Sequence, residues 1–490
     1  MNAIINGTNV TFEAGETILA VAGRYGFFIP SLCAFQPMDH KPGVCRVCLV
    51  SCTPPSGNPC LVPACVTPME EGMRVETSTP EIRAHQRMQV ELLLAEHHLA
   101  CETCARHGDC ELQQLKETLG IDTSAPQGEA RPAQVLHGIT RDMDKCVRCL
   151  RCVTVCRRQG AKALRADSSG QNPEIIELTE ASCIQCGQCT RVCPVGAIAE
   201  RDDSAAALEV LTSTDAFPVV AFSGFVHDAL KRVFSSSCAD LEGRLAACLR
   251  HLGARVVVNA DIVAGALAST MSEELRTRLA EGRALPLFSA ACPAWVNYAQ
   301  TRLPGIDSLL SSARVPEALA ASLNRNALSR RYGVAEERIR LILVSPCTAM
   351  KQEADVVLSA RDLARLMNLG GLCPDDVAAE SFDAFPQPDD AHGCVGHCGE
   401  LTKAVMRGLG ANIRLEGLPE ACRAVPGDHD LLESTVDLGA LGVVKTALCF
   451  NCATAATLAA QALEGRSPYA FVEVLACPGG CAQGGGSERF

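Results

Sequence analysis

This sequence lacks the signals that would send a protein across or into a membrane. Its first residues, Met1 to Gly7, contain no basic stretch followed by an apolar run and no twin-arginine pair, so no secretory signal is predicted. No window of about 18 uncharged apolar residues occurs, and therefore no membrane-spanning helix is expected. We accordingly expect a cytoplasmic protein.

Nucleotide-binding motifs and an excess of positive charge are also missing. No P-loop occurs and no GxGxxG follows an expected strand, so NAD or ATP would have to bind elsewhere. Lys and Arg number 44 against 56 Asp and Glu, which gives a formal net charge of −12 at pH 7. An acidic surface of this kind argues against a nucleic-acid partner. The 490 residues, 48% of them hydrophobic, are enough for several domains with their own cores.

Cysteine, by contrast, is abundant, with 29 residues in the chain. In a long chain without a secretory signal, so many thiols are expected to bind metals rather than to form disulfides. Nineteen of them fall into five sets whose spacings are typical of iron–sulfur proteins, in which thiolate is the usual ligand. These sets divide the chain into four predicted domains, so we expect a multidomain protein of α+β and α/β class.

The first set lies in a β-grasp domain predicted over residues 1–80. Alternating apolar residues, a turn near Gly15 and a helical stretch from Thr17 to Tyr25 give the strand, turn and helix of that fold. The set itself is Cys33, Cys45, Cys48 and Cys65. Its C-x11-C-x2-C spacing with a distant fourth cysteine fits a [2Fe-2S] loop, and Gly43 would let the backbone turn tightly around the cluster. Zinc is the alternative, although zinc ribbons usually carry two C-x2-C pairs and this loop has one.

The second set lies in a segment predicted over residues 81–125. Its members are His97, Cys101, Cys104 and Cys110, spaced H-x3-C-x2-C-x5-C. A helix expected from Ala84 to Glu96 would carry the histidine. One imidazole and three thiolates can hold a [4Fe-4S] cluster, and the neutral imidazole should shift its reduction potential. His98 is a competing ligand that only the spacing disfavours.

Two further sets form an internal repeat over residues 137–205. Each reads C-x2-C-x2-C-x3-C, which is typical of bacterial ferredoxins with two clusters, where the fourth cysteine of each run binds the other cluster. We therefore pair Cys146, Cys149 and Cys152 with Cys193, and Cys183, Cys186 and Cys189 with Cys156. A chain of four clusters has a purpose only if something at its end consumes or supplies electrons.

The C-terminal half, residues 210–490, is predicted to be an α/β domain. Apolar runs at 218–222, 254–258 and 339–344 alternate with helical stretches such as 241–252, which indicates a mainly parallel sheet. Function in such sheets lies in loops at the carboxyl ends of the strands. Three motifs suited to such loops contain Cys292, Cys347, Cys477 and Cys481. The four thiols could hold one more [4Fe-4S] cluster, with neighbouring glycines allowing close backbone approach; four unrelated thiols are the alternative.

These three motifs together resemble the catalytic domain of the [FeFe]-hydrogenases, and the N-terminal half resembles the accessory-cluster region of the same family. The resemblance implies that the four loop cysteines bind a [4Fe-4S] cluster. It also implies that Cys481 bridges this cluster to a two-iron subsite carrying CO, CN⁻ and a dithiolate amine. The whole is the H-cluster, which interconverts protons, electrons and H₂ and whose subsite requires maturation enzymes. The implied enzyme is a ferredoxin- or NAD-linked [FeFe]-hydrogenase.

The sequence departs from the family pattern along the proton path. Glu274 and Ser311 match proton-path positions of the family, but the family's outer glutamate is Met271 here. The family's first motif has two adjacent cysteines, of which the first passes protons to the amine. That position is Ala291 in this sequence, and alanine has no proton to give. We therefore expect low activity unless water replaces the missing groups.

A second group of departures surrounds the expected subsite. The family's lysine, which donates to a cyanide, is Met350 here, and a thioether cannot donate a hydrogen bond. Lys351 beside it is expected to point elsewhere. Two methionines that flank the subsite in the family are Ser345 and Leu475 here. The chain stops nine residues after Cys481, where many relatives continue or receive a small subunit, so a small partner chain is expected.

Ten cysteines lie outside the five sets, since 29 minus 19 leaves ten. They are Cys52, Cys60, Cys238, Cys248, Cys373, Cys394, Cys398, Cys422, Cys449 and Cys452. Most are expected to be small core residues. The close pairs Cys394–Cys398 and Cys449–Cys452 are hypothesised to form a further metal site, with His397 as another candidate ligand.

Three functions compete. The first is an [FeFe]-hydrogenase that evolves, takes up or senses H₂. The second is an electron-transfer subunit, because residues 1–205 also resemble the iron–sulfur subunit of NADH dehydrogenases and of some formate dehydrogenases; the three loop motifs argue against a pure relay. The third is a protein that keeps its cubane but has lost the two-iron subsite. Ala291 and Met350 keep this third interpretation open. Ferredoxin or NADH-dehydrogenase-like subunits are the expected partners.

Overall fold

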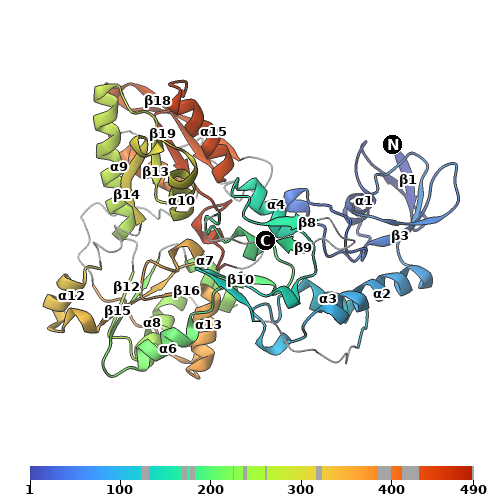
Figure 1. The fold of residues 1–490 in the computed structure, drawn as a ribbon, viewed down its shortest axis with the longest axis horizontal. Helices are drawn as coiled ribbons and strands as arrows, with labels where there is room; N and C mark the ends of the chain where they lie inside the picture. The colour runs from blue at the N-terminus through green and yellow to red at the C-terminus, as the bar shows by residue number, and fades with distance from the viewer. Residues whose placement is uncertain are drawn as a thin grey trace.

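The computed structural model describes residues 1–122, 132–167, 174–176, 182–223, 226–234, 240–259, 262–315, 323–384, 399–410 and 430–487. Figure 1 shows a small N-terminal part in blue, a central part in teal and green, and a larger C-terminal part built on two sheets. The central part lies between the other two (Figure 1). Among the described helices, none has the length and apolar character needed to span a bilayer.

The N-terminal part is a five-stranded sheet with the order β2-β1-β5-β3-β4 and a helix packed against it. Its strands are β1 (Asn2–Ile5), β2 (Thr8–Thr11), β3 (Leu49–Thr53), β4 (Cys60–Pro63) and β5 (Arg74–Glu76). Helix α1 (Ile18–Arg24) begins after Thr17, whose hydroxyl accepts a hydrogen bond from the backbone of Ala20. Its buried face joins the sheet in one apolar cluster. The predicted order of strand, turn and helix is confirmed.

Helix α2 (Pro80–Glu96) starts earlier than the predicted Ala84. Thr79 caps its N-terminus, and Pro80 occupies the first position, where a missing N–H leaves no intrahelical bond unmade. The helix ends at Glu96, so His97 follows directly as its C-cap. A 3₁₀ turn, η2 (Cys101–Thr103), and helix α3 (Glu111–Thr118) come next.

The central part holds the two cysteine repeats beside a three-stranded sheet with the order β10-β7-β6. Its strands are β6 (Gln134–Leu136), β7 (Ile139–Arg141) and β10 (Ile198–Glu200), with a separate hairpin of β8 (Arg165–Asp167) and β9 (Glu174–Ile176). Each repeat leads into a helix, α4 (Arg151–Arg158) or α5 (Gln188–Val192). The residues that precede these helices, Leu150 and Gly187, have φ of 64° and 67°. The sequence repeat is therefore also a repeat of backbone conformation.

The C-terminal part contains two sheets, which lie in separate lobes in Figure 1. The first, with the order β12-β11-β15-β16, is parallel throughout and consists of β11 (Phe217–Phe222), β12 (Val256–Asn259), β15 (Ile339–Val344) and β16 (Val356–Leu358). The second has the order β14-β13-β19-β18-β17 and is parallel except for β17. Its strands are β13 (Leu287–Ala290), β14 (Leu310–Arg314), β17 (Leu431–Asp437), β18 (Val443–Cys449) and β19 (Phe471–Val474).

Helices cover both sheets and complete the α/β architecture that the sequence predicts. They are α6 (Ser204–Thr212), α7 (His227–Phe234), α8 (Leu241–His251), α9 (Ile262–Glu281), α10 (Pro293–Arg302), α12 (Arg325–Tyr332), α13 (Ala360–Leu369), α14 (Glu400–Gly408) and α15 (Cys452–Leu463). The predicted strands at 218–222 and 339–344 and the helix at 241–252 are confirmed. The strand predicted at 254–258 begins later, at Val256, because the chain still turns at Gly253 and Ala254.

Candidate metal centres

The four cysteines of the first set meet between α1 and the β3–β4 hairpin, and all four are buried. The Cys33 thiol hydrogen-bonds to those of Cys45 and Cys65, and these bonds lower the pKa of the Cys33 thiol. Cys48 in turn hydrogen-bonds to Cys65. Gly43 has a φ of +67°, and a Cβ there would lie 3.2 Å from Val66 Cγ1, so the tight loop favours glycine. The contacts of Cys33 with Cys45 and Cys65, and of Cys65 with Cys48, thus link the four thiols at the place where the spacing predicts a cluster.

The side chain of His97, in the second set, has the surroundings expected of a metal ligand. It is buried, one ring nitrogen hydrogen-bonds to the backbone of Lys145, and Nδ1 has no hydrogen-bond partner among the described residues. Burial lowers the pKa of the imidazole and so favours the neutral form, which is the form that binds metals. A Cβ on Gly196 would collide with Cys104 Sγ, which brings this set against the second cysteine repeat. Since His98 is partly exposed, the geometry favours His97 as the ligand.

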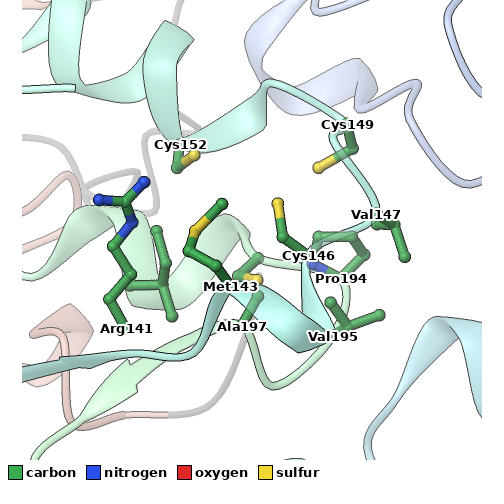
Figure 2. Close-up of a pocket in the computed structure, with 11 residues that line it drawn as sticks. Arg141, Met143, Cys146, Val147, Cys149, Cys152, Pro194, Val195 and Ala197 are labelled. Carbon is green, nitrogen blue, oxygen red and sulfur yellow. The ribbon is translucent and has the colours of Figure 1, made fainter. Parts of the chain in front are cut away.

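The first ferredoxin-like pocket combines both cysteine repeats. Cys146, Cys149, Cys152 and Cys193 line one cavity together with Arg141, Met143, Val147, Pro194, Val195, Ala197 and Ile198. Figure 2 shows the sulfur atoms of Cys146, Cys149 and Cys152 turned toward this cavity. Burial, with a smaller contribution from Cys193, raises the pKa of the Cys146 thiol to about 11. The crossed set predicted from the sequence is therefore brought together around a cavity lined mainly by thiols and apolar side chains.

The second ferredoxin-like pocket combines the remaining cysteines of the two repeats, namely Cys156 with Cys183, Cys186 and Cys189. Burial raises the pKa of the Cys183 and Cys186 thiols, and the neighbouring charge of Cys156 adds to that effect in both. The Cys156 sulfur accepts hydrogen bonds from the backbone N–H groups of Ala163 and Leu164, at 3.1 and 3.5 Å. Backbone donors of this kind orient a thiolate and tune the potential of the cluster that it holds.

The four cysteines of the C-terminal motifs follow the carboxyl ends of three strands, as predicted. Cys292 comes after β13, Cys347 after β15, and Cys477 and Cys481 lie in the loop after β19. Cys477 is buried, which raises the pKa of its thiol, and Cys292, Cys347 and Cys481 each contribute further to that rise. The thiol of Cys292 accepts hydrogen bonds from the backbones of Ala476, Trp295 and Ala294. The four thiols are thus neighbours around Cys477, unlike four unrelated core cysteines.

The second ferredoxin-like pocket lies directly beside this catalytic set. The charge of Cys186 contributes to the raised pKa of the Cys477 thiol, and the charge of Cys292 contributes to the raised pKa of the Cys186 thiol. A Cβ on Gly485 would lie 2.7 Å from the Cα of Gly187, closer than real Cβ atoms approach. Glycine at these positions lets the loop after β19 rest on the second cysteine repeat, which leaves little space between the two sites.

Residues that replace the family's polar groups are buried among apolar side chains. Met271, Ala291 and Met350 belong to one apolar cluster, and Cys347 packs against it. Lys351 points elsewhere, as predicted: its Nζ lies 3.0 Å from Asp203, 2.6 Å from Asp362 and 2.6 Å from the Val357 carbonyl. Neither substitution at 291 or 350 is compensated by that lysine.

Two predicted proton-path residues are in direct contact. The Ser311 hydroxyl donates to Glu274 Oε2 at 2.6 Å, and the backbone N–H of Ser312 donates to Oε1 at 2.9 Å. Glu274 lies on α9 and both serines lie on β14. Ser312 was not expected from the sequence, although its position next to Ser311 gave a signal.

The hypothesised extra metal site lies only partly within the described residues. Cys394, His397 and Cys398, like Cys238 and Cys422, fall outside them. Cys449 ends β18 and Cys452 begins α15, and both are fully buried. The further metal site therefore stays a prediction.

Arg151 is a positioning residue that the cysteine pattern did not reveal. It lies on α4 between the ligand candidates Cys149 and Cys152, and its guanidinium is almost fully buried. It donates to the carbonyls of Leu32 at 2.5 Å and Ala34 at 2.9 Å in the first cysteine loop, and to both carboxylate oxygens of Glu111 at 2.7 and 2.8 Å. The only sequence signal was an arginine inside a cysteine motif.

Gln159, which was not predicted either, joins the central part to the catalytic domain. Its side-chain amide donates to the carbonyl of Ala476 at 2.8 Å and accepts from the backbone of Cys452 at 3.3 Å. With Arg151 it anchors both ends of helix α4, one to the N-terminal part and the other to the loop that carries Cys477.

Comparisons with known families agree with this arrangement. Residues 217–485 match the family described as iron only hydrogenase large subunit, C-terminal domain. Residues 2–80 match a 2Fe-2S iron–sulfur cluster binding domain, 86–125 the NADH-ubiquinone oxidoreductase-G iron–sulfur binding region, and 126–197 a 4Fe-4S dicluster domain. The match over residues 2–80 favours the [2Fe-2S] interpretation of the first set over the zinc alternative.

Individual relatives repeat the same pattern. The NADP-reducing hydrogenase subunit HndD of Solidesulfovibrio fructosivorans is 29% identical over 98% of this chain and 88% of its own. Iron hydrogenase 1 of Clostridium pasteurianum is 25% identical over 99% of this chain and 88% of its own. A solved structure of the [FeFe]-hydrogenase HydA1 from Chlamydomonas reinhardtii shares the fold, with a TM-score of 0.50 and 20% identity over 59% of this chain and 85% of that one. The chain is thus an iron–sulfur oxidoreductase that belongs to the iron-only, or [FeFe]-, hydrogenase large-subunit family.

Proposed function

We propose that this chain interconverts protons, electrons and H₂ at an H-cluster that four accessory clusters supply with electrons. The observation that carries the proposal is the meeting of Cys292, Cys347 and Cys481 around Cys477, with Cys186 of the nearest ferredoxin-like pocket beside them. A catalytic cluster at this place would exchange electrons with the accessory clusters without crossing solvent.

The proposed ligands follow the five groups of side chains. A [2Fe-2S] cluster would be held by Cys33, Cys45, Cys48 and Cys65, and a [4Fe-4S] cluster by His97, Cys101, Cys104 and Cys110. Two more [4Fe-4S] clusters would be held by Cys146, Cys149, Cys152 and Cys193, and by Cys156, Cys183, Cys186 and Cys189. The H-cluster would be held by Cys292, Cys347, Cys477 and Cys481, the last also bridging to the two-iron subsite.

When bound, the H-cluster supplies the redox chemistry that joins protons and electrons into H₂. The protein's own residues bury the thiols, point backbone N–H groups at Cys292, and hold a proton-accepting carboxylate at Glu274 against Ser311. Ala291 cannot pass a proton and Met350 cannot donate to a cyanide. Turnover is therefore expected to be slower than in relatives with cysteine and lysine at these positions.

Infrared spectroscopy of protein co-produced with the H-cluster maturation enzymes tests this proposal. Bands from iron-bound CO and CN⁻ are expected, because only the two-iron subsite carries these ligands. If every cubane is loaded and the bands are absent, the hydrogenase proposal is wrong.

A second candidate is an electron-transfer subunit or H₂ sensor without an efficient two-iron subsite. It is favoured by the enclosure of Met271, Ala291 and Met350 in one apolar cluster beside Cys347. Under this alternative the cubanes exchange electrons with another centre, so the chain would be reduced by its donor and would turn over no H₂.

The partners follow from the relatives and belong to the same proposal. HndD is by its name a subunit of an NADP-reducing hydrogenase. We expect NADH-dehydrogenase-like subunits, with ferredoxin as the alternative donor. Affinity purification of the tagged chain from its own cells should therefore bring down a pyridine-nucleotide-oxidising subunit, whereas purification of the chain alone would favour ferredoxin.

A further inference from the structure

Glu473 is a fully buried carboxyl group that the proposed function does not use. It lies on β19, four residues before Cys477, and has no exposed surface. Among the described residues no lysine, arginine or histidine forms an ion pair with it. An ionised carboxylate is costly in such a place, whereas the neutral acid is tolerated.

Thr402 donates hydrogen bonds to only one of the two carboxylate oxygens of Glu473. Oε2 accepts from both the backbone N–H and the hydroxyl of Thr402 on α14, at 2.9 and 2.5 Å. The Gly399 backbone also donates to the carboxyl, and among the residues that the structure describes Oε1 is buried with no hydrogen-bond partner. One oxygen is therefore held in place while the other is free to carry a proton.

Burial decides the protonation of Glu473. It raises the pKa of the carboxyl to about 7, against the hydrogen bonds from Thr402 and the Gly399 backbone, which act to lower it. Glu400 on α14 adds to the rise, and Lys403, the nearest cation on that helix, is paired with Glu400 at 2.7 Å. The neighbouring strands contribute no charge at this level, since β18 places Leu448 opposite Glu473 and β13 supplies Ser289, which accepts from the backbone of Val474 at 3.0 Å.

The place of Glu473 in the sheet brings it toward the catalytic site. Residues alternate between the faces of a strand, so Phe471, Glu473 and Leu475 share one face of β19 and its continuation. Phe471 belongs to the apolar cluster of Met271 and Ala291. Leu475 packs against Cys481 in a small apolar cluster. Glu473 thus lies two residues before Leu475 on the same face of the strand, and Leu475 packs against the proposed bridging cysteine.

We propose that Glu473 is a proton-holding site of the catalytic domain, which binds a proton when the adjoining cluster is reduced and releases it on reoxidation. The electron enters the cluster, a proton from solvent joins the carboxylate oxygen, and the only bond made is O–H. An added electron nearby penalises the carboxylate, so reduction and protonation favour each other. The inference goes beyond the proposed function and rests on it only for the cluster at Cys477.

The test is infrared difference spectroscopy of the full-length, cluster-loaded protein between its oxidised and reduced states near pH 7. A carboxylic-acid C=O band should appear on reduction, move in D₂O, and be missing from Glu473→Gln. Glu400→Gln, which removes the neighbouring carboxylate on α14, should keep the band. Its absence from the wild-type protein, or its survival in Glu473→Gln, would overturn the proposal. Visible absorption of the same sample reports cluster reduction, so a failure of the proposed function is seen separately.

A second variant tests the same site if Glu473→Gln folds poorly. Thr402→Val removes the hydroxyl that donates to Oε2 and so removes a bond that stabilises the carboxylate. The pH at which the C=O band is half lost in the oxidised protein should therefore rise in Thr402→Val. An unchanged or lower midpoint would assign the band to another group and contradict the proposal.

Discussion

Under the proposed function, proton supply would depend on a few individual side chains. Ala291 is 8% exposed and packs in the same apolar cluster as Met271, so two polar positions of the family's path are closed to protons. Glu274 and Ser311 remain hydrogen-bonded to each other at 2.6 Å. The proton path therefore keeps the Glu274–Ser311 contact in its middle but lacks polar groups at both ends. This should limit the rate of the reaction and leave binding of the cluster unaffected.

The Ala291→Cys variant should therefore evolve H₂ faster, by at least about tenfold, since a positioned acid–base group contributes roughly 10²–10⁴-fold. H₂ evolution with an artificial donor, normalised to the infrared CO bands, is the measurement. Ala290→Cys places a thiol one residue earlier, at the last position of β13, and is the matched control. No gain in a variant that carries the subsite would mean that protons arrive by another route.

The carboxyl group of Glu473 should also make the free energy of unfolding of the protein depend on pH. Its folded pKa is about 7 against an ordinary value of 4.5. Between these values the folded state holds a proton that the unfolded state has lost, so stability falls as pH rises through this window. The loss amounts to about 3 kcal/mol above pH 7. Glu473→Gln carries no ionisable group at this position and should escape that loss.

The unfolding midpoint of Glu473→Gln, relative to wild type, should therefore rise between pH 5 and pH 8. Glu400→Gln, at a partly exposed carboxyl of the adjacent helix, provides the comparison. Parallel pH profiles for wild type and Glu473→Gln would show that the carboxyl is ionised throughout and would remove the basis for its proposed role.

At the scale of elements, helix α4 makes contacts with both the N-terminal part and the C-terminal part of the molecule. Arg151 at its start binds the first cysteine loop and Glu111, while Gln159 just after its end binds Ala476 and Cys452. Cys152 and Cys156 lie between them on the same helix. One short helix thus links the N-terminal part, both ferredoxin-like cysteine sets and the loop after β19.

Arg151→Ala should loosen the first cysteine loop without removing any ligand. Hydrogen bonds to charged groups are worth about 1.5–3 kcal/mol each, so backbone amides of residues 32–35 should exchange with D₂O on the order of 100-fold faster. Arg157→Ala, an exposed arginine on the same helix, is the control. Unchanged exchange would show that the loop is held by its own cluster and that the arginine contributes little.

Cysteine spacing predicted the groups of thiols because iron–sulfur ligands must follow the chain closely. The crossed sets around Cys193 and Cys156, and the alternation of strands and helices after residue 210, follow from such local patterns. Arg151, Gln159 and Glu473 could not be predicted, because their partners lie far away along the sequence. The start of α2 differed from expectation because Thr79 and Pro80 form a better N-terminus than the apolar pattern alone indicated.

At the scale of the whole molecule, the proposed cluster sites would form a branched path for electrons. The first and second sets both contact the region of the Cys146 pocket, through Arg151 in one case and through Gly196 against Cys104 in the other. From there the path would continue to the second ferredoxin-like pocket, which contains Cys186 (the Cys186 pocket), and then to the four cysteines around Cys477. Every electron that reaches the catalytic site from either branch is therefore expected to pass the Cys186 pocket.

Cys186→Ser should separate catalysis from electron supply. The H-cluster would still exchange H₂ with D⁺, because that reaction needs no net electrons, while H₂ evolution driven by a protein donor should be largely lost. Cys60→Ser, at an exposed cysteine outside the ligand sets, is the control. Full donor-driven activity in Cys186→Ser, with its cubane missing, would require electrons to enter the catalytic domain directly.

The position of Gly485 against Gly187 also sets an order of events during synthesis. Domains generally fold from the N-terminus as the chain leaves the ribosome. The accessory domains can therefore close around their clusters while β19 is still being made, whereas the pocket of Cys292, Cys347, Cys477 and Cys481 is complete only after the loop that follows β19 has reached the second cysteine repeat. Under the proposed function, the H-cluster site would stay open until then to the maturation enzymes that fill it.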